Sequence, residues 1–297
     1  MEQKVGSVGI NWINLDEHLM RWLQEDIGRG DQTTLGLADM GNQLGQGYWL
    51  AKASGVICGL PVAQRVFAIL TDVNGASAEP TEFELCIAEG EWVEAGTTLA
   101  RIGGSLATLL MRERVALNLA MHMSGIATAT RQYVDEIADL PAQLVDTRKT
   151  TPGLRVLEKY ATRIGGATNH RMGLDDGVMI KDNHIAAAGG IAQAIAGIRS
   201  RMPYPLTVEV ETENLEQVQS ALNHGADIIM LDNMAPAMMV EAVQIIRQQG
   251  PKVKIEGSGN VTLGTIRAIA MTGVDYISSS APITRSSWLD LSMRIKS

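Results

Sequence analysis

From residue 144 onward, the sequence alternates short apolar runs with helical segments. The apolar runs end in polar residues and occupy 143–147, 179–183, 206–212, 227–233, 253–259 and 276–280. The helical segments between them include 190–200, 214–224, 236–249 and 262–272. Continuous apolar strands separated by helices indicate a parallel sheet that is covered on its outside. The segment 165–168 is a candidate for one more short strand. Six or seven such units predict an α/β barrel that is incomplete, because eight cannot be counted.

The first part of the chain has a different pattern and predicts a separate domain. Residues 15–26 have the apolar spacing of a helix that buries one face. Residues 46–102 predict short strands and turns, punctuated by glycines. Residues 105–138 predict a long helix that closes the first domain and enters the second.

The composition limits the classes of partner. The chain has 297 residues and a net charge of −8, which argues against nucleic acid or an anionic membrane as a main partner. No apolar stretch approaches the length of about 18 residues that a membrane span needs. The N-terminus lacks the pattern of a secretion signal, so a cytoplasmic location is expected. Cys58 and Cys86 lie in apolar contexts and are expected to be buried thiols, although their number also allows a disulfide.

Polar residues gather at the ends of the predicted strands, where barrel enzymes carry their active sites. The cationic ends carry Thr147, Arg148, Lys149, His170, Arg171 and Lys181. The middle strands end in Glu211 and Asp232. The last two strands end in Ser258, Gly259 and Asn260, and in Ser278, Ser279 and Ser280. The predicted site is therefore cationic on one side, acidic in the middle and rich in hydroxyl groups on the other.

The two outer parts of this site are suited to anions. Loops rich in Gly and Ser before helices leave backbone N–H groups free for a phosphate, although the same loops can also be simple tight turns. Arginine matches a carboxylate or phosphate with two parallel hydrogen bonds, while lysine acts as a mobile point charge. Arg155, Lys159 and Arg163 lie on the helix after the first strand and are expected to face solvent.

The acidic residues leave several roles open. Glu211 and Asp232 can be ion-pair partners of the cations, bind sugar hydroxyl groups, bind Mg²⁺ or stabilise a developing positive charge. Glu209 points to the same side of its strand as Glu211, so either residue can face the site. His170 and His184 lack a third soft ligand nearby in the sequence. Zinc is therefore improbable, and hydrogen bonding to substrate or backbone is the expected role of these histidines.

Together these motifs resemble the quinolinate phosphoribosyltransferase family. The resemblance covers nearly the whole chain and includes "EDIGRGDQTT", "RERVALNLAMHMSGIAT", "DTRKTTPGLRVLEKYA", "GGATNHRMGLDDGVMIKDNH", "VEVET", "DIIMLDN" and "EGSGNV". The run 146–184 is the longest and most specific part. The chain departs from the family pattern at 278–286, where Ser280 replaces a glycine and Arg285 replaces a common histidine. Ser280 can still present its N–H to a phosphate if its φ is negative.

The resemblance implies an α/β fold class, with an N-terminal α/β sandwich domain and an incomplete seven-stranded α/β barrel. The expected domains are 1–120 for the sandwich, 121–280 for the barrel with the active site, and 281–297 for a tail that packs back on the first domain. The implied reaction joins quinolinate and phosphoribosyl pyrophosphate, with Mg²⁺, to give nicotinate mononucleotide, pyrophosphate and CO₂. The family resemblance also implies a homodimer with shared active sites, or a higher oligomer built from it.

The resemblance also implies roles for individual residues. The expected catalytic residues are Lys149, Glu211 and Asp232, which surround the phosphoribosyl pyrophosphate. The expected substrate-binding residues are Arg114, Thr147, Arg148, His170, Arg171, Lys181, Ser258, Gly259, Asn260, Ser279 and Ser280. Arg114 is expected to reach the neighbouring subunit's site. No side chain is expected to be a dedicated metal ligand, because Mg²⁺ binds mainly through the pyrophosphate of the substrate.

Three alternatives stay open at this point. A relative with the same fold can act on another acid, such as nicotinate, although the full set of cations favours a dicarboxylate. A lyase with a barrel fold can use Lys149 or Lys181 as a Schiff base. The hairpin at 90–101 faintly resembles that of biotinyl and lipoyl carrier domains, but it contains no acceptor lysine.

Overall fold

The computed structural model describes residues 10–37, 43–69 and 81–296. The chain divides into two compact units. One contains residues 1–128, 163–165 and 286–297, and the other contains 129–162 and 166–285. The predicted α/β class is confirmed, because the first unit has a sheet with helices and the second has a parallel sheet with helices.

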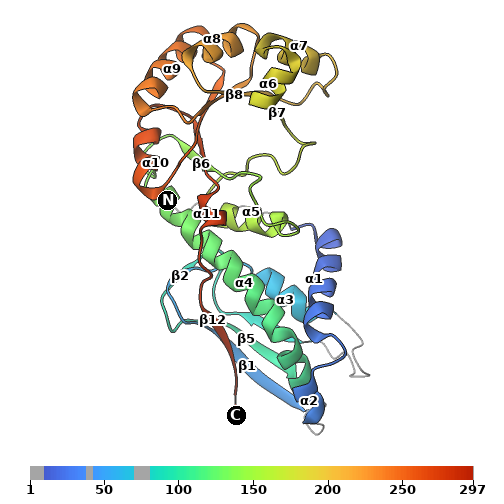
Figure 1. The fold of residues 1–297 in the computed structure, drawn as a ribbon. Coiled ribbons are helices and arrows are strands. Elements are labelled where there is room, and N and C mark those ends of the chain that lie inside the picture. Colours follow the sequence, from blue (N-terminus) through green and yellow to red (C-terminus); the bar gives the residue numbers. More distant parts are fainter. Residues whose placement is uncertain (1–9, 38–42, 70–80, 297) are drawn as a thin grey trace. The chain divides into compact units, whose positions relative to one another are not determined.

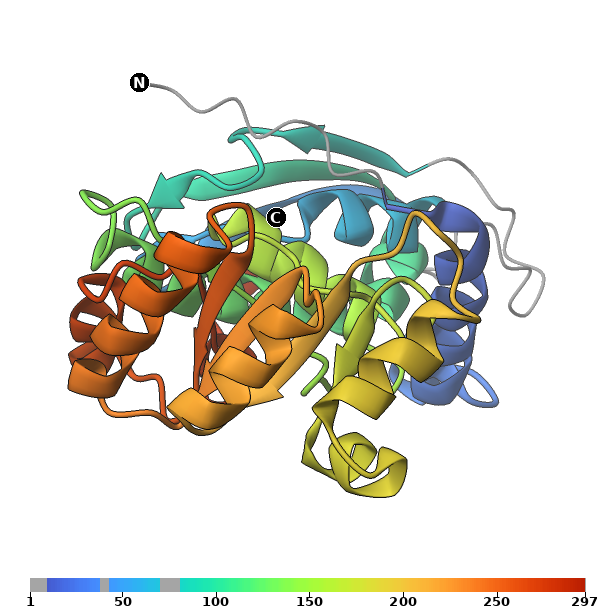
Figure 2. The ribbon, with the colours of Figure 1, turned by 90° about the horizontal axis from the view of Figure 1, so that it is seen from above.

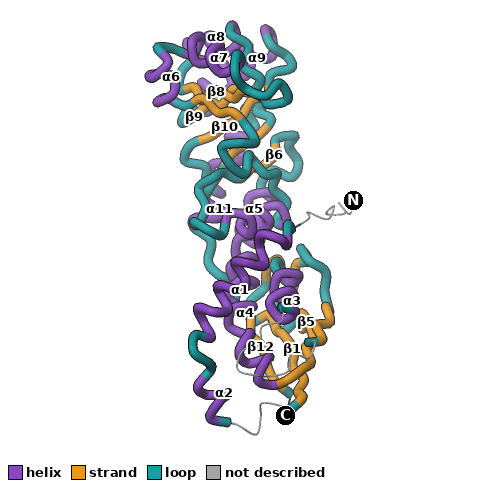
Figure 3. Tube along the Cα trace, turned by 90° about the vertical axis from the view of Figure 1, so that its right-hand side faces the viewer, coloured by secondary structure: helices purple, strands orange, loops and turns teal. Residues whose placement is uncertain are grey.

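The first unit contains a four-stranded antiparallel sheet in the order β12-β1-β5-β3. Its strands are β1 (Leu44–Ala51), β3 (Glu82–Leu85), β5 (Thr98–Ser105) and β12 (Leu291–Ile295). A second pair joins β2 (Gly55–Val56) to β4 (Trp92–Val93). Figure 3 shows β1, β5 and β12 side by side. The C-terminal strand β12 pairs with β1 from Leu291 to Ile295, so the chain's end completes the sheet of the first unit.

The helices of the first unit are α1 (Trp12–Ile27), α2 (Gln32–Gly36), α3 (Leu60–Ala68) and most of α4 (Leu106–Asp135) (Figure 1). The sequence prediction missed α3, since residues 46–102 were expected to hold only strands and turns. Pro61 fits the first turn of a helix, where its missing N–H costs nothing. Phe67 of α3 packs with Trp49 and Phe83, at ring-centroid distances of 6.4 and 5.8 Å. The apolar face of α3 is therefore buried against Trp49 and Phe83.

Both cysteines are free, so the disulfide that their number allowed does not form. Cys58 is buried, as expected, but Cys86 is exposed. Cys86 follows β3, where Leu85 is also exposed, because the apolar alternation of this strand ends at the buried Phe83. The apolar context of Cys86 was therefore a poor guide to its burial.

The second unit contains six parallel strands in the order β6-β11-β10-β9-β8-β7 (Figure 2). They are β6 (Gln143–Val145), β7 (Val178–Ile180), β8 (Val208–Thr212), β9 (Ile228–Asp232), β10 (Lys254–Ser258) and β11 (Tyr276–Ser278). Thr168 adds a single parallel bridge to Val145, at the position where a seventh strand was expected. Among the described strands β7 pairs only with β8, so the sheet does not close between Thr168 and β7.

The helices of the second unit are α5 (Arg155–Ile164), α6 (Asp182–Ala188), α7 (Ile191–Arg199), α8 (Leu215–Asn223), α9 (Pro236–Gln249), α10 (Leu263–Ala270) and α11 (Ala281–Thr284). Those from α7 to α10 cover the outer face of the sheet (Figures 1 and 2). Val210, Ile229 and Ile255 belong to the apolar core that these helices bury. None of the helices within residues 10–37, 43–69 and 81–296 is long and apolar enough to cross a bilayer.

The alternation along each strand decides what the inner face carries. Because successive side chains point to opposite sides of a sheet, burying Val208 and Val210 of β8 under helices turns Glu209 and Glu211 inward. The same alternation turns Asp232 of β9 and Glu256 of β10 inward. The barrel interior is therefore polar at its C-terminal end, and this is where the site lies.

Candidate active site

A cavity of about 880 Å³ lies at the C-terminal ends of the parallel strands. All of the strand-end residues proposed from the sequence line this cavity. They are Thr147, Arg148, Lys149, His170, Arg171, Lys181, Glu211, Asp232, Ser258, Gly259, Asn260, Ser278, Ser279 and Ser280. Arg114 lies on α4 in the first unit and is not among the lining residues. The structure therefore brings together the charge pattern that the sequence predicted for the barrel.

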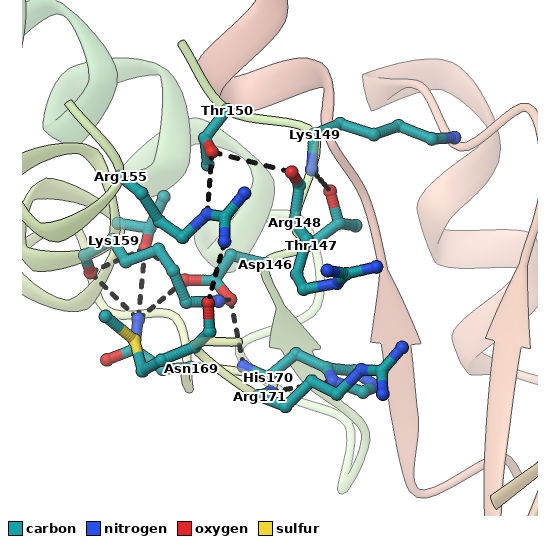
Figure 4. Close-up of polar contacts among 12 residues, drawn as sticks. Asp146, Thr147, Arg148, Lys149, Thr150, Arg155, Lys159, Asn169, His170 and Arg171 are labelled. Carbon is teal, nitrogen blue, oxygen red and sulfur yellow. Dashed lines mark hydrogen bonds and ion pairs between the residues drawn. The ribbon is translucent and has the colours of Figure 1, made fainter. Parts of the chain in front are cut away.

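Asp146 connects the segments that carry the cationic residues. It directly follows β6 and is 2% exposed. Its carboxylate forms a buried ion pair with the Lys159 ammonium group (Figure 4). It also accepts hydrogen bonds from Thr162 Oγ1 at 2.8 Å, Asn169 Nδ2 at 2.6 Å and the backbone N–H of His170 at 2.9 Å. One buried carboxylate thus joins the end of β6, helix α5 and the segment that carries His170.

The prediction that Lys159 faces solvent was wrong, since the residue is 1% exposed. Burial lowers the pKa of Lys159, although the neighbouring Asp146 carboxylate favours the charged ammonium group. Arg155 also departs from the prediction, because it lines the cavity and is half-buried. Its guanidinium donates to Thr150 Oγ1 at 3.0 Å and to the Met172 carbonyl at 3.1 Å. Arg163 is exposed, as expected.

Arg148 and Arg171 form the open part of the cationic side. Arg171 donates from Nη1 to the Gly177 carbonyl at 2.7 Å, and this bond fixes the direction of its side chain. Burial, and then the nearby charge of Arg148, lowers the pKa of Arg171. Within the described part of the chain, the Arg148 guanidinium has no hydrogen-bond partner. Two guanidinium groups with spare donors and mutual repulsion form a site that an anion would stabilise.

The acidic middle of the site has two carboxylates in different settings. Glu211 pairs with Lys181 at 2.6 Å between Oε2 and Nζ. Asp232 has no ion pair within the described residues, and its Oδ2 accepts from Asn233 Nδ2 at 2.7 Å. Asp232 is half-buried and lines the cavity, so it can meet a cation or a hydroxyl group of a ligand.

The hydroxyl-rich side contains a tight loop that requires glycine. Gly259 has φ +93°, and a Cβ there would collide with the side chain and backbone nitrogen of Asn233. Asn260 also has a positive φ, at 52°, and donates from Nδ2 to Asn233 Oδ1 at 3.2 Å. Ser280 has φ −90°, so a serine is accommodated there without backbone strain. These loops can present backbone N–H groups to a phosphate.

Sequence reasoning missed a buried cluster at the base of the cavity. His170 Nε2 lies 3.1 Å from Glu209 Oε2 and 3.5 Å from Glu256 Oε2. Its Nδ1 accepts a 2.8 Å hydrogen bond from the Arg171 backbone N–H, which fulfils the expected bonding of this histidine to backbone. Burial, followed by the charge of Glu209, raises the pKa of Glu256 to about 7. A glutamate at an inward position of the apolar strand β10 was the available signal for Glu256.

Comparison with known proteins agrees with this arrangement. The model of the quinolinate phosphoribosyl transferase C-terminal domain matches residues 126–294, and the N-terminal domain model matches residues 31–124. The chain belongs to the quinolinate phosphoribosyltransferase family. It is 59% identical over 285 residues to a probable nicotinate-nucleotide pyrophosphorylase [carboxylating] of Synechocystis, covering 96% of this chain and 93% of that protein. A Bacillus subtilis protein of the same name is 40% identical over 287 residues, covering 96% and 95%.

Solved structures of quinolinate phosphoribosyltransferase relatives have the same fold. The crystal structure of NadC from Streptococcus pyogenes aligns with a TM-score of 0.89 at 38% identity and covers 98% of this chain and 99% of that one. The nicotinate-nucleotide pyrophosphorylase from Francisella tularensis aligns with a TM-score of 0.88 at 33% identity over 100% of both chains. The likeness therefore extends over both units.

The buried ion pair gives a testable prediction for stability. Lys159→Met keeps most of the side-chain volume but leaves the Asp146 carboxylate unpaired in the interior. We expect the free energy of unfolding to fall by about 3–5 kcal/mol, which is typical when one partner of a buried pair is removed. Urea unfolding followed by circular dichroism measures this change. The matched control is Arg163→Met on the exposed face of the same helix, expected within about 0.5 kcal/mol of wild type. Equal stability of the two variants would contradict the buried pair.

Proposed function

We propose that this protein transfers the phosphoribosyl group of phosphoribosyl pyrophosphate to quinolinate and removes CO₂, giving nicotinate mononucleotide and pyrophosphate for the synthesis of NAD. The observation that carries this proposal is the order of charges around the cavity, in a chain that belongs to the quinolinate phosphoribosyltransferase family. Cations, carboxylates and phosphate-type loops follow one another, in the order in which the acid, the ribose and its phosphate would be bound.

The cationic side is proposed to bind quinolinate. This substrate carries two adjacent carboxylates, and the guanidinium groups of Arg148 and Arg171 have donors to spare for both. Lys181 adds a third N–H donor group, although its pairing with Glu211 neutralises much of its charge. A substrate with a single carboxylate, such as nicotinate, would leave one of these half-buried cations without a partner, which is costly. The dicarboxylate therefore fits better than the rival acid.

The carboxylates and Lys149 are proposed to act on the sugar. The ring nitrogen of quinolinate forms a bond to the anomeric carbon while the bond from that carbon to pyrophosphate breaks. Positive charge develops on the ribose at this stage, and Glu211 and Asp232 can stabilise it. Lys149 is exposed at the cavity and can neutralise the departing pyrophosphate. Holding the two reactants in this order supplies much of the rate enhancement through proximity.

Decarboxylation follows from the new bond. The ring nitrogen becomes cationic, so it stabilises the electron pair that stays on the adjacent ring carbon as CO₂ leaves. The ring carbon that loses CO₂ then takes up a proton. A Schiff base at Lys149 or Lys181 is not needed for any of these steps, and Lys181 is already paired with Glu211.

Magnesium is proposed as the cofactor. It would be bound mainly by the pyrophosphate oxygens of the substrate, and Asp232 offers a suitable hard oxygen ligand because it has no ion pair among the described residues. When bound, the ion neutralises the charge of the leaving pyrophosphate. The serine and glycine loops at 258–260 and 278–280 are proposed to bind the 5′-phosphate through backbone N–H groups and hydroxyl groups.

The assembly is proposed to be a homodimer in the cytoplasm, with Arg114 of each subunit serving the site of its neighbour. Such sharing is compatible with an isologous interface. Mixing inactive Arg114→Ala and Lys149→Ala proteins tests it, because a heterodimer would regain one site that carries neither substitution. Heterodimers without any recovered turnover would contradict the sharing of sites.

A turnover assay tests the proposed reaction directly. The protein is incubated with phosphoribosyl pyrophosphate, Mg²⁺ and either quinolinate or nicotinate. We expect stoichiometric release of CO₂ and pyrophosphate with quinolinate and at least about a hundredfold lower turnover with nicotinate, because one cationic partner is then missing. Equal or faster turnover with nicotinate would overturn the choice of substrate.

Arg171→Lys tests the binding of the substrate carboxylate. Lysine keeps the charge but lacks the planar fork that binds a carboxylate with two parallel hydrogen bonds. We expect the KM for quinolinate to rise by about tenfold or more while the KM for phosphoribosyl pyrophosphate changes little. The matched control is Arg201→Lys, an exposed position outside the cavity. An unchanged KM for quinolinate would remove Arg171 from the binding site.

A further inference from the structure

Below the cationic side lies a cluster of three titratable residues that the proposed chemistry does not use. His170, Glu209 and Glu256 place their ligand atoms within 4.8 Å of one another. Glu209 and Glu256 are each 3% exposed, and both direct Oε2 at the same imidazole nitrogen. Oε1 of each glutamate is buried and has no hydrogen-bond partner among the residues that the structure describes. Two carboxylates in such a place are unusual and need a compensating charge.

The charged groups around the cluster do not supply full compensation. Glu256 faces Glu209, His170 and Lys181, and also the hydroxyl group of Ser278. Lys181 is held by Glu211, so its charge is largely neutralised. Lys159 lies near His170 but is paired with Asp146. The Arg171 guanidinium also attracts Glu209, but it is the group that is proposed to bind the substrate carboxylate. Two buried carboxylates this close cannot both ionise at low cost, and the simplest compensation is one proton held between them.

The positions of the heavy atoms show that the additional proton of the cluster does not lie on His170 Nδ1. His170 Nδ1 accepts the Arg171 backbone N–H, so a proton on Nδ1 would face another donor. The imidazole is therefore assigned as the neutral tautomer, with its proton on Nε2 between the two carboxylates. The additional proton of the cluster then belongs to the carboxyl groups.

We propose that Glu209 and Glu256 share one proton, and that this acid pair is a positioning element for the quinolinate site, acting through His170 on Arg171. The proposal rests on the proposed function, because the ligand it positions Arg171 for is quinolinate. The two carboxyl groups hold the Nε2–H side of the ring. The opposite nitrogen holds the Arg171 backbone, and the Arg171 side chain is then directed into the cavity by its bond to Gly177.

Loss of the shared proton has two consequences for the site. The cluster gains a negative charge below the place where the dianionic substrate binds, and repels it. The added charge also favours protonation of His170, whose pKa is already raised: burial lowers it, but the hydrogen bond and charges of the glutamates outweigh burial. A proton on Nδ1 would break the bond to Arg171. Quinolinate binding should therefore weaken as the pair ionises.

The same proton affects stability without any substrate. The pKa of Glu256 is raised to about 7 from its ordinary value of 4.5, so the folded protein holds a proton that the unfolded chain has lost. This contribution to stability is complete below pH 4.5 and is lost as the pH rises through about 7. Glu256→Gln carries no titrating group and keeps an oxygen for His170. Relative to wild type, this variant should therefore become more stable as the pH rises.

Thermal unfolding of the full chain at about pH 5 and about pH 8 tests the shared proton. We expect the difference in Tm between Glu256→Gln and wild type to be more favourable to the variant by about 5 °C at the higher pH. Glu209→Gln should change the Tm difference in the same direction but by less, because it removes the neighbouring charge while burial still raises the pKa of Glu256, and it replaces the first variant if that one does not fold. Glu241→Gln, at an exposed position of α9, is the matched control and should follow wild type. A Tm difference that does not change with pH in both cluster variants would overturn the proposal.

Kinetics of the same proteins test the positioning role. In wild type, the KM for quinolinate should rise about fivefold between about pH 7 and 8, the ratio for one group with a pKa of about 7 that must be protonated. In Glu256→Gln, this KM should stay nearly constant over the same range, while kcat and the KM for phosphoribosyl pyrophosphate follow wild type. A parallel rise of the quinolinate KM in both proteins would overturn the link to Arg171.

Two controls separate the possible failures. The unfolding experiment needs no substrate, so it stands even if the enzyme prefers another acid. The compensating charge could instead be a metal ion, because one imidazole and two carboxylates can bind one. An increase of the wild-type Tm with Mn²⁺ or Zn²⁺ that Glu256→Gln abolishes would overturn the shared proton.

Discussion

The buried ion pair between Asp146 and Lys159 is the interaction on which the cationic site depends. Such a pair is not a simple source of stability, because removing two charges from water costs as much as their attraction returns. Asp146 instead holds several segments in place, since its carboxylate also accepts hydrogen bonds from Thr162, Asn169 and the backbone of His170. It lies between β6 and Thr147, the first residue of the cationic loop. The pair therefore fixes two cation-bearing segments to one point.

The alternation of the parallel strands supplies the rest of the site. Each strand of the parallel sheet buries its outward-facing side chains under helices. Polar side chains lie on its inward face, near its C-terminal end. Glu211 and Asp232 lie at that end and reach the cavity. Glu209 and Glu256 lie one step deeper and are buried. The depth along the strand thus separates the half-buried carboxylates from the buried ones, of which Glu256 still borders the cavity and Glu209 does not.

Much of the barrel and its strand-end residues could be predicted from the sequence, because a parallel sheet brings all its C-terminal ends to one edge. The burial of Lys159 could not, since its spacing on α5 resembles that of an exposed residue and its partner Asp146 lies on another element. Glu256 was missed for a related reason: its importance comes from His170 and Glu209, which are far away in the sequence. Helix α3 was missed because its exposed face holds only Gln64, Arg65 and Ala68 within nine residues, a pattern too short to stand out from the strands expected around it. The aromatic cluster with Trp49 and Phe83 makes its burial evident.

The most direct test of this account is the binding of quinolinate to the double variant Asp146→Asn with Lys159→Met. Replacing both partners leaves no buried charge unpaired, so the protein should remain folded with a Tm close to that of wild type. The neutral amide is a weaker acceptor for the His170 N–H, and calorimetry should show a dissociation constant for quinolinate at least about tenfold higher. Phosphoribosyl pyrophosphate is proposed to bind mainly through the loops at 258–260 and 278–280, so its affinity should fall less than that of quinolinate, even though Lys149 lies on the cationic loop. A folded double variant that binds quinolinate as tightly as wild type would contradict the claim that Asp146 positions the cationic site.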